Sequence, residues 1–263
     1  MLFTFFVACL ILGALVGFLA GLLGIGGGLV IVPALVYLLP QMGIATEVAM
    51  PIALGTSLAT IVVTSITAVR AHHKNRNIPW QLTRQIMIVV ACGAIAGANI
   101  ADQLSSAMLT YIFAMSVSVL AAYMLISIRF DKTGSMPSLP VFQGVGFFTG
   151  VMASLMGIAG GAILIPILSY FGVQMRQSIG IATACGLIIA FFGSLGYILT
   201  GLDQKELPPW SLGYVYLPAL LGISLTSSLF ARLGVKLSAK LPVKTLKKCF
   251  AVFLILVAVR MVL

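Results

Sequence analysis

The sequence predicts an all-α polytopic membrane protein made of two repeats with inverted topology. Three observations support this fold class. Of the 263 residues, 61% are hydrophobic and only 8% are charged, whereas soluble domains carry about 25% charged residues. Apolar stretches long enough to cross a bilayer recur along the whole chain. A glycine-rich motif also occurs once in each half, at residues 24–33 and again at residues 157–166.

Ten apolar segments follow one another along the chain, and each is expected to form a helix. In order they cover residues 2–23, 29–39, 49–69, 80–101, 107–128, 141–156, 162–171, 177–200, 210–231 and 245–263. Most of them are long enough to cross about 30 Å of hydrocarbon at about 1.5 Å per residue. The second and the seventh are short, and each follows a glycine cluster. The first lacks the basic start of a signal peptide, so we expect it to be a retained span.

The stretch with the composition of a loop, residues 130–140, divides the chain almost in half. Landmarks in the first half return in the same order in the second, at a nearly constant offset. We therefore expect a first repeat over residues 1–129, a cytoplasmic linker over residues 130–140 and a second, inverted repeat over residues 141–263. Together they would form one transmembrane domain of about five membrane segments per repeat, with broken or short helices at the glycine-rich turns.

The charges of the loops indicate the inversion. Residues 70–76 are strongly basic, whereas the corresponding loop of the second half, residues 203–206, is slightly acidic. The next pair of loops reverses this pattern, because the loop that contains Asp102 corresponds to a basic run over residues 232–248 in the second half. Basic loops stay in the cytoplasm, so equivalent loops face opposite sides. An inverted repeat needs an odd number of membrane crossings in each half. Five crossings per half predict ten in total, with both termini outside the cytoplasm. The two short segments count among the ten, either as full crossings or as half-helices.

The glycine clusters are the first candidates for a binding site. A helix that begins after a glycine turn presents free N–H groups and about half a positive charge, and glycine lets a ligand approach the backbone closely. Two such turns at corresponding positions of two halves predict an anion site near the midplane of the membrane. The alternative is that the glycines allow close helix packing. The expected substrate-binding residues from these clusters are Gly26, Gly27, Gly28, Ala159, Gly160 and Gly161.

Hydroxyl and thiol side chains are expected to complete this site. Thr56 and Ser57 follow the first short segment, and Thr183 and Cys185 follow the second. A hydroxyl binds an anion without adding charge to the membrane, and the alternative is a hydrogen bond to the carbonyl of the preceding helical turn. For Cys185 the alternative is packing in the core. Asp102 is expected at the interface, with proton coupling as the alternative.

Other functional classes lack their sequence signals. No nucleotide-phosphate loop, zinc-protease motif or Cys/His cluster occurs in the chain, so we expect no enzyme, no metal site and no cofactor. The net charge of +10 resides largely in short loops between apolar segments, where membrane orientation accounts for it. Nucleic acid is therefore not expected as a partner. Trp80, Trp210, Tyr214 and Tyr216 are expected to act as interfacial anchors.

Four motifs together carry a resemblance to a known family. They are Gly17-x-x-x-Gly21-x-x-Gly24-Ile25-Gly26-Gly27-Gly28 followed by Pro33, then Gly55-Thr56-Ser57, the second copy ending at Pro166, and Leu241-Pro242 to Leu246. This pattern spans essentially the whole chain and is similar to that of the TauE/SafE family, the sulfite-exporter group of bacterial membrane proteins. The second copy departs from it, because Ala159 replaces a glycine and because Ala184 and Cys185 follow Thr183.

The resemblance implies a function that agrees with the anion site. It implies a secondary transporter that moves a small sulfur-containing anion, such as sulfite or sulfoacetate, across the bacterial inner membrane by alternating access. The expected partners are this anion and the lipid bilayer. A coupling proton or ion and a second copy of the chain stay open as further partners. Two alternatives also stay open, an anion channel and a non-transporting membrane assembly protein.

Overall fold

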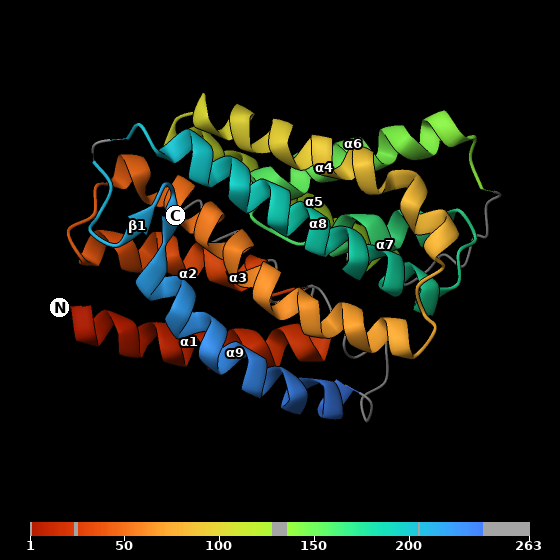
Figure 1. Cartoon of the computed structure of the whole chain (residues 1–263), viewed down its shortest axis with the longest axis horizontal. Coiled ribbons are helices and arrows are strands. Elements are labelled where there is room, and N and C mark those ends of the chain that lie inside the picture. Colours follow the sequence, from red (N-terminus) through yellow and green to blue (C-terminus); the bar gives the residue numbers. More distant parts are fainter. Residues whose placement is uncertain (1, 24–25, 128–135, 205, 239–263) are drawn as a thin grey trace.

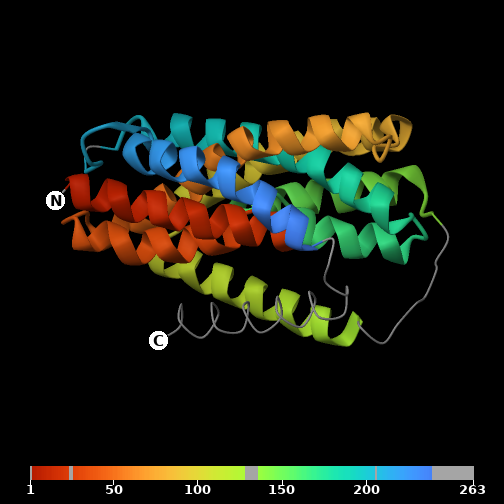
Figure 2. The ribbon, with the colours of Figure 1, turned by 90° about the horizontal axis from the view of Figure 1, so that it is seen from below.

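The protein is a bundle of helices that run along one long axis (Figures 1 and 2). The computed structural model describes residues 2–23, 26–127, 136–204 and 206–238. Its elements in chain order are α1 (Leu2–Leu23), α2 (Gly28–Gln41), α3 (Thr46–Lys74), α4 (Trp80–Asp102), α5 (Ser106–Ser127), α6 (Leu139–Leu155), α7 (Gly161–Tyr170), α8 (Met175–Gly201), β1 (Ser211–Leu212), β2 (Val215–Tyr216) and α9 (Leu217–Ser238).

The first eight predicted helices are confirmed to within a few residues at each end. The ninth differs, because α9 begins at Leu217 and not near residue 210. Strands β1 and β2, which directly precede α9 in the chain, form an antiparallel hairpin with Leu212 opposite Val215. Gly213 lies in the turn with φ of 53°, a left-handed conformation that glycine adopts easily. The tenth predicted segment, residues 245–263, lies outside the described residues.

Four described helices are long and apolar enough to cross a membrane, namely α3, α4, α8 and the stretch Phe3–Ala20 of α1. The two helices that follow the glycine clusters are shorter. Helix α7 has 10 residues and α2 has 14. At about 1.5 Å per residue α7 extends only about 15 Å, which is half of the hydrocarbon core of a bilayer.

The two short helices run from the middle of the molecule towards opposite ends (Figure 1). The end of α2 lies near the start of α3, where Val36 and Pro40 border the same cavity as Asp102. Helix α7 ends at the other side, where α8 begins. There a Cβ atom at Gly180 of α8 would collide with the backbone of Asn77, in the connection between α3 and α4.

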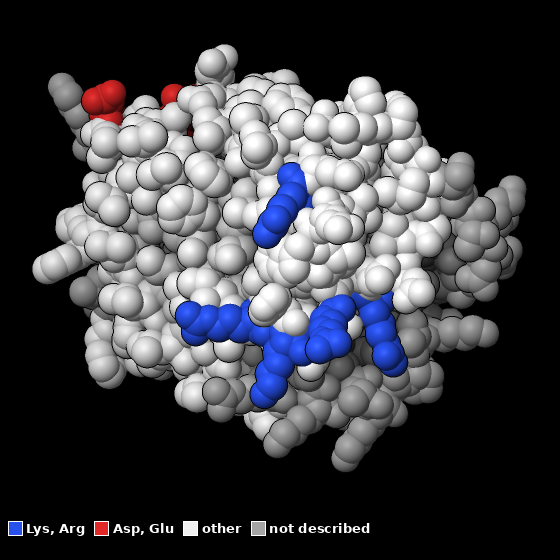
Figure 3. Space-filling model, turned by 45° about the vertical axis from the view of Figure 1, so that its right-hand side comes forward, with Lys and Arg blue, Asp and Glu red and all other residues white. Residues whose placement is uncertain are grey.

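The two ends differ in charge. All described acidic side chains lie at the end that carries the hairpin, and all described Lys and Arg side chains lie at or near the opposite end, most of them in one cluster (Figure 3). The residues of the acidic end are Glu47, Asp102, Asp203 and Glu206, and those of the basic end are Arg70, Lys74, Arg76, Arg84 and Arg176. This separation fits a protein whose basic end faces the cytoplasm.

Close helix crossings depend on small residues. A Cβ atom at Gly17 of α1 would collide with the backbone of Ser227 in α9, and one at Gly93 of α4 would collide with the carbonyl of Phe147 in α6. Small residues at crossings let helix backbones approach in membranes, where packing and not the hydrophobic effect joins helices. These glycines therefore have a packing role.

Candidate functional site

The two glycine clusters meet at the centre of the molecule. A Cβ atom at Gly28, the first residue of α2, would collide with the carbonyl oxygen of Gly157. A Cβ atom at Gly26 would lie 3.1 Å from the Cβ of Ala159. The two clusters are more than a hundred residues apart in the sequence, so the fold brings their backbones into direct contact.

Glycine is needed to form the turn between α6 and α7. Gly157 has φ of 62° and ends α6, because its N–H donates to the carbonyl of Ser154 while the N–H of Ile158 donates to that of Ala153. This pair of bonds is the Schellman motif, in which the residue after the helix adopts a left-handed conformation. Gly160, with φ of 70°, then forms the N-cap of α7.

Helix α7 begins with unsatisfied N–H groups. The N–H groups of Ile163 and Leu164 both donate to the carbonyl of Gly160, and no side chain caps this end. For the preceding amides, those of Gly161 and Ala162, the described part of the chain provides no acceptor. Helix α2 begins in the same way after Gly27. Such N–H groups and the helix dipole favour an anion.

Ser57 joins α3 to the glycine turn of the other half. Its hydroxyl donates to the carbonyl oxygen of Gly157 at 2.7 Å, and its side chain is fully buried. Leu54, one turn earlier on α3, would contact a Cβ atom at Gly157. The hydroxyl therefore does not bond to its own helix, which was the alternative expected for it. It holds the glycine turn in position.

We expect Ser57→Ala to lower the free energy of unfolding by about 1–3 kcal/mol, because it leaves the buried Gly157 carbonyl without this donor. Thr183→Val is the matched control. The Thr183 hydroxyl donates to Ile179 of its own helix at 2.7 Å, so its loss should matter much less. Denaturant unfolding of the purified protein in detergent measures both, and equal losses would contradict the structural role of Ser57.

Thr56 binds a different element. Its Oγ1 accepts a hydrogen bond from the backbone N–H of Tyr216 at 3.0 Å, and its side chain is fully buried. Two consecutive side chains of α3 therefore reach in different directions. Thr56 contacts the hairpin, and Ser57 contacts the glycine turn.

The other expected site residues lie around this centre. The hydroxyl of Thr183 makes the back-bond expected as its alternative. Gly186, three residues later on the same face of α8, would place a Cβ atom 2.7 Å from the Ala159 carbonyl oxygen. Cys185 is fully buried in the core.

Three glycines of the clusters differ in their surroundings. A Cβ atom at Gly27 would collide with Val16 of α1, and one at Gly160 would lie 2.6 Å from Cδ1 of Ile189 in α8. Both positions therefore face neighbouring helices. Gly161 is buried, yet a Cβ atom there would contact only Cδ1 of Ile165, at 3.8 Å. Room for a methyl group thus exists beside the first residue of α7.

The hairpin contains polar contacts that the sequence interpretation missed. The prediction of interfacial anchors is wrong for Tyr214 and Tyr216, whose exposed fractions are 5% and 3%. The Tyr214 hydroxyl donates to Oδ1 of Asp102 at 3.3 Å, and its ring meets that of Tyr197 edge to face. A glycine at the first position of a two-residue turn, as at Gly213, followed by the strand formers Val215 and Tyr216, is the hairpin signal that could have revealed this.

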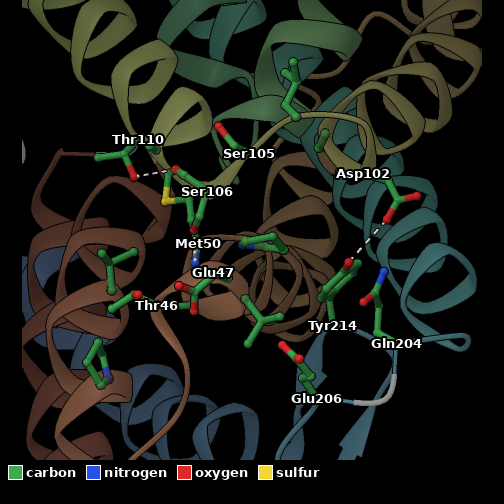
Figure 4. Close-up of a pocket in the computed structure, with 18 residues that line it drawn as sticks. Thr46, Glu47, Met50, Asp102, Ser105, Ser106, Thr110, Gln204, Glu206 and Tyr214 are labelled. Carbon is green, nitrogen blue, oxygen red and sulfur yellow. Dashed lines mark hydrogen bonds between the residues drawn. The ribbon is translucent and has the colours of Figure 1, made fainter.

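A cavity of about 610 Å³ opens at the acidic end (Figure 4). It is bordered by Glu47, Asp102, Glu206 and Tyr214. At its wall, the hydroxyl oxygen of Ser106 accepts a hydrogen bond from the backbone N–H of Met50. Burial and the neighbouring Asp102 carboxylate raise the pKa of Tyr214 to about 12, so its hydroxyl stays a donor at physiological pH. Within the described part of the chain, no three His, Cys, Asp or Glu residues are grouped to hold a metal ion.

Comparison with known proteins gives relatives over the whole chain. The family model described as "Sulfite exporter TauE/SafE" matches residues 9–261. A "Probable membrane transporter protein" of Haemophilus influenzae is 44% identical over 100% of both chains. Proteins with the same description from Methanocaldococcus jannaschii and Bacillus subtilis are 29% and 22% identical, covering 90% and 98% of this chain and 88% and 97% of the relatives. No solved structure matches the chain significantly.

Proposed function

Because the chain belongs to the TauE/SafE family of membrane transporters, we propose that it is a secondary transporter for a small sulfur-containing anion, such as sulfite or sulfoacetate. It works by alternating access in the bacterial inner membrane. The family name supports the substrate class, and the apolar helices support a multi-pass protein.

The observation that carries this proposal is the contact between two glycine-led helix starts at the centre of the molecule. Unsatisfied amides at these starts attract an anion without a basic side chain. This matters because every described Lys and Arg side chain lies at or near the basic end, and a charged side chain at the centre of a membrane is costly. The substrate would bind the amides of Gly161 and Ala162, with Gly26, Ala159 and Thr183 nearby.

The opposite directions of α2 and α7 support the inverted duplication of residues 1–129 and 141–263 across the linker at residues 130–140. In this conformation Gly28 and Gly157 are in contact. An anion between the two turns requires them to separate. A movement of one repeat against the other around the midplane achieves this in transporters with inverted repeats, and it opens the site to one side at a time.

Exchange in proteoliposomes tests this function. Vesicles loaded with unlabelled sulfite, thiosulfate or sulfoacetate are diluted into the labelled anion, and uptake is compared with vesicles loaded with phosphate, chloride or an uncharged thiol. A carrier shows saturable uptake that the internal sulfur anion accelerates. Ohmic conductance without acceleration would support a channel, and the absence of flux for every compound would support a non-transporting assembly protein.

A further inference from the structure

We propose that the hairpin of β1 and β2 is the gate of the transport pathway on its acidic side, and that Thr56 and Tyr214 hold this gate closed. The inference rests on the proposed transport function, since it assigns a role in access to the same central site. It makes Thr56 a positioning residue and not a ligand of the substrate.

The position of the hairpin follows from the order of contacts along α3. Met50 and Pro51 border the cavity at the acidic end. Gly55 and Thr56 contact the hairpin, and Ser57 bonds to the glycine turn. From Met50 to Ser57 the helix rises only about 10 Å. The hairpin therefore lies beside the short stretch of α3 that separates the cavity from the glycine turns, with Tyr214 itself in the cavity wall (Figure 4).

Few polar contacts hold the hairpin, and each goes to a different helix. The N–H of Tyr216 donates to Thr56 of α3, the N–H of Tyr214 donates to the Tyr197 carbonyl of α8, and the Tyr214 hydroxyl donates to Asp102 of α4. A Cβ atom at Gly55 would lie 2.9 Å from the Tyr214 carbonyl oxygen, so glycine lets the hairpin fit tightly. A two-stranded hairpin is marginally stable alone, so its position depends on these bonds and on the packing of its buried side chains.

Thr56 and Ser57 couple the hairpin to the glycine turns. The hydrogen bond from Ser57 to Gly157 has a length of 2.7 Å, and the one that Thr56 accepts from Tyr216 has a length of 3.0 Å. Because the two residues are adjacent on one rigid helix, a displacement of the turn that pulls on Ser57 also moves Thr56. Contacts of this kind can carry coupling between two sites. Separation of the turns and release of the hairpin are then linked.

Accessibility of a thiol at the glycine turn tests the gate. The reporter is Ala159→Cys in a protein whose native cysteines, Cys9, Cys92, Cys185 and Cys249, are replaced by alanine. A membrane-impermeant maleimide is applied to each side of sealed vesicles in turn. We expect Thr56→Val and Tyr214→Phe to raise the labelling rate roughly threefold to tenfold, the effect of one lost hydrogen bond, from the hairpin side only.

Matched controls separate the gate from general loosening. Thr60→Val removes a hydroxyl that bonds only within α3, and Tyr111→Phe removes one from an exposed ring of α5. Both should label at the unmodified rate. Thr56→Ser keeps the acceptor and should do the same. If Ala159→Cys does not fold, Gly161→Cys serves as the single reporter, because a Cβ atom there would contact only Cδ1 of Ile165, at 3.8 Å.

The outcomes distinguish the gate from the substrate assignment. Labelling of Thr56→Val and Tyr214→Phe at the unmodified rate overturns the gate, whatever the substrate. Acceleration by the hairpin variants but not by the controls supports it. Slower labelling of the reporter cysteine in the presence of sulfite or thiosulfate, which we call protection, is a separate measurement from the effect of the hairpin variants. Acceleration without protection would retain the gate and reject the sulfur anion, and protection without acceleration would do the reverse.

Discussion

A single methyl group at Gly28 is expected to abolish transport. The Cβ atom of Gly28→Ala would collide with the carbonyl oxygen of Gly157 and lie 3.0 Å from the Cα of Ile158. Both are backbone atoms of the other glycine turn, so no side-chain rotation relieves the contact. Overpacking of this kind costs about 1–3 kcal/mol. The strain acts at the point where the two halves meet, so we expect the turns to be unable to close against each other, which blocks the movement that alternating access requires.

Gly144→Ala is the control for this prediction. Gly144 is an exposed residue of α6, and a Cβ atom there would meet nothing within 4 Å. Alanine is favoured over glycine in helices by about 1 kcal/mol, so stability should stay the same or rise. Flux per inserted protein in proteoliposomes measures both variants. Transport by Gly28→Ala at the rate of the unmodified protein would contradict the contact between the turns.

Gly161→Ala is expected to weaken substrate binding without weakening the fold. The methyl group fits in the structure, because its nearest neighbour is Cδ1 of Ile165 at 3.8 Å. It would however lie beside the unsatisfied amides that begin α7, where the proposed anion must approach the backbone closely. We expect a rise of about tenfold in the transport KM, equivalent to about 1.4 kcal/mol of binding free energy, with an unchanged unfolding temperature.

Comparison with Gly27→Ala sharpens this test. A Cβ atom at Gly27 would collide with the side chain of Val16 in α1, so this variant should lose stability through packing. KM and unfolding temperature, measured on both variants, then separate the two effects. A KM of Gly161→Ala equal to that of the unmodified protein would show that the first residue of α7 does not contact the substrate.

Much of the fold could be predicted from the sequence, because apolar length and the glycine clusters define the helices α1 to α8 and the two short helices among them. The hairpin could not be predicted in the same way. Residues 210–216 are apolar and aromatic, and such a run fits the start of a membrane helix as well as a buried strand. The error in the start of α9 and the wrong placement of Tyr214 and Tyr216 share this cause.

The residues of the candidate site could be proposed from the sequence, but their contacts could not. Repetition of the glycine motif indicated that Gly28 and Ala159 belong to related turns. The hydrogen bond from Ser57 to Gly157 joins residues 100 positions apart, which only the packing of α3 against the second half determines. The partner of Thr56 depends on the hairpin. The back-bond of Thr183, a local contact within one helix, was among the expected alternatives.

Thermal unfolding of the purified protein with a series of anions tests most directly whether the paired glycine turns hold a sulfur anion. A ligand that binds only the folded state stabilises it increasingly with concentration, by about 2.7 kcal/mol at 100 times Kd. We predict that sulfite, thiosulfate or sulfoacetate raises the unfolding temperature in this way, that an uncharged thiol does not, and that Gly161→Ala needs about tenfold more anion for the same rise. No rise with any of these anions, or an equal rise in Gly161→Ala, would contradict an anion site at the glycine turns.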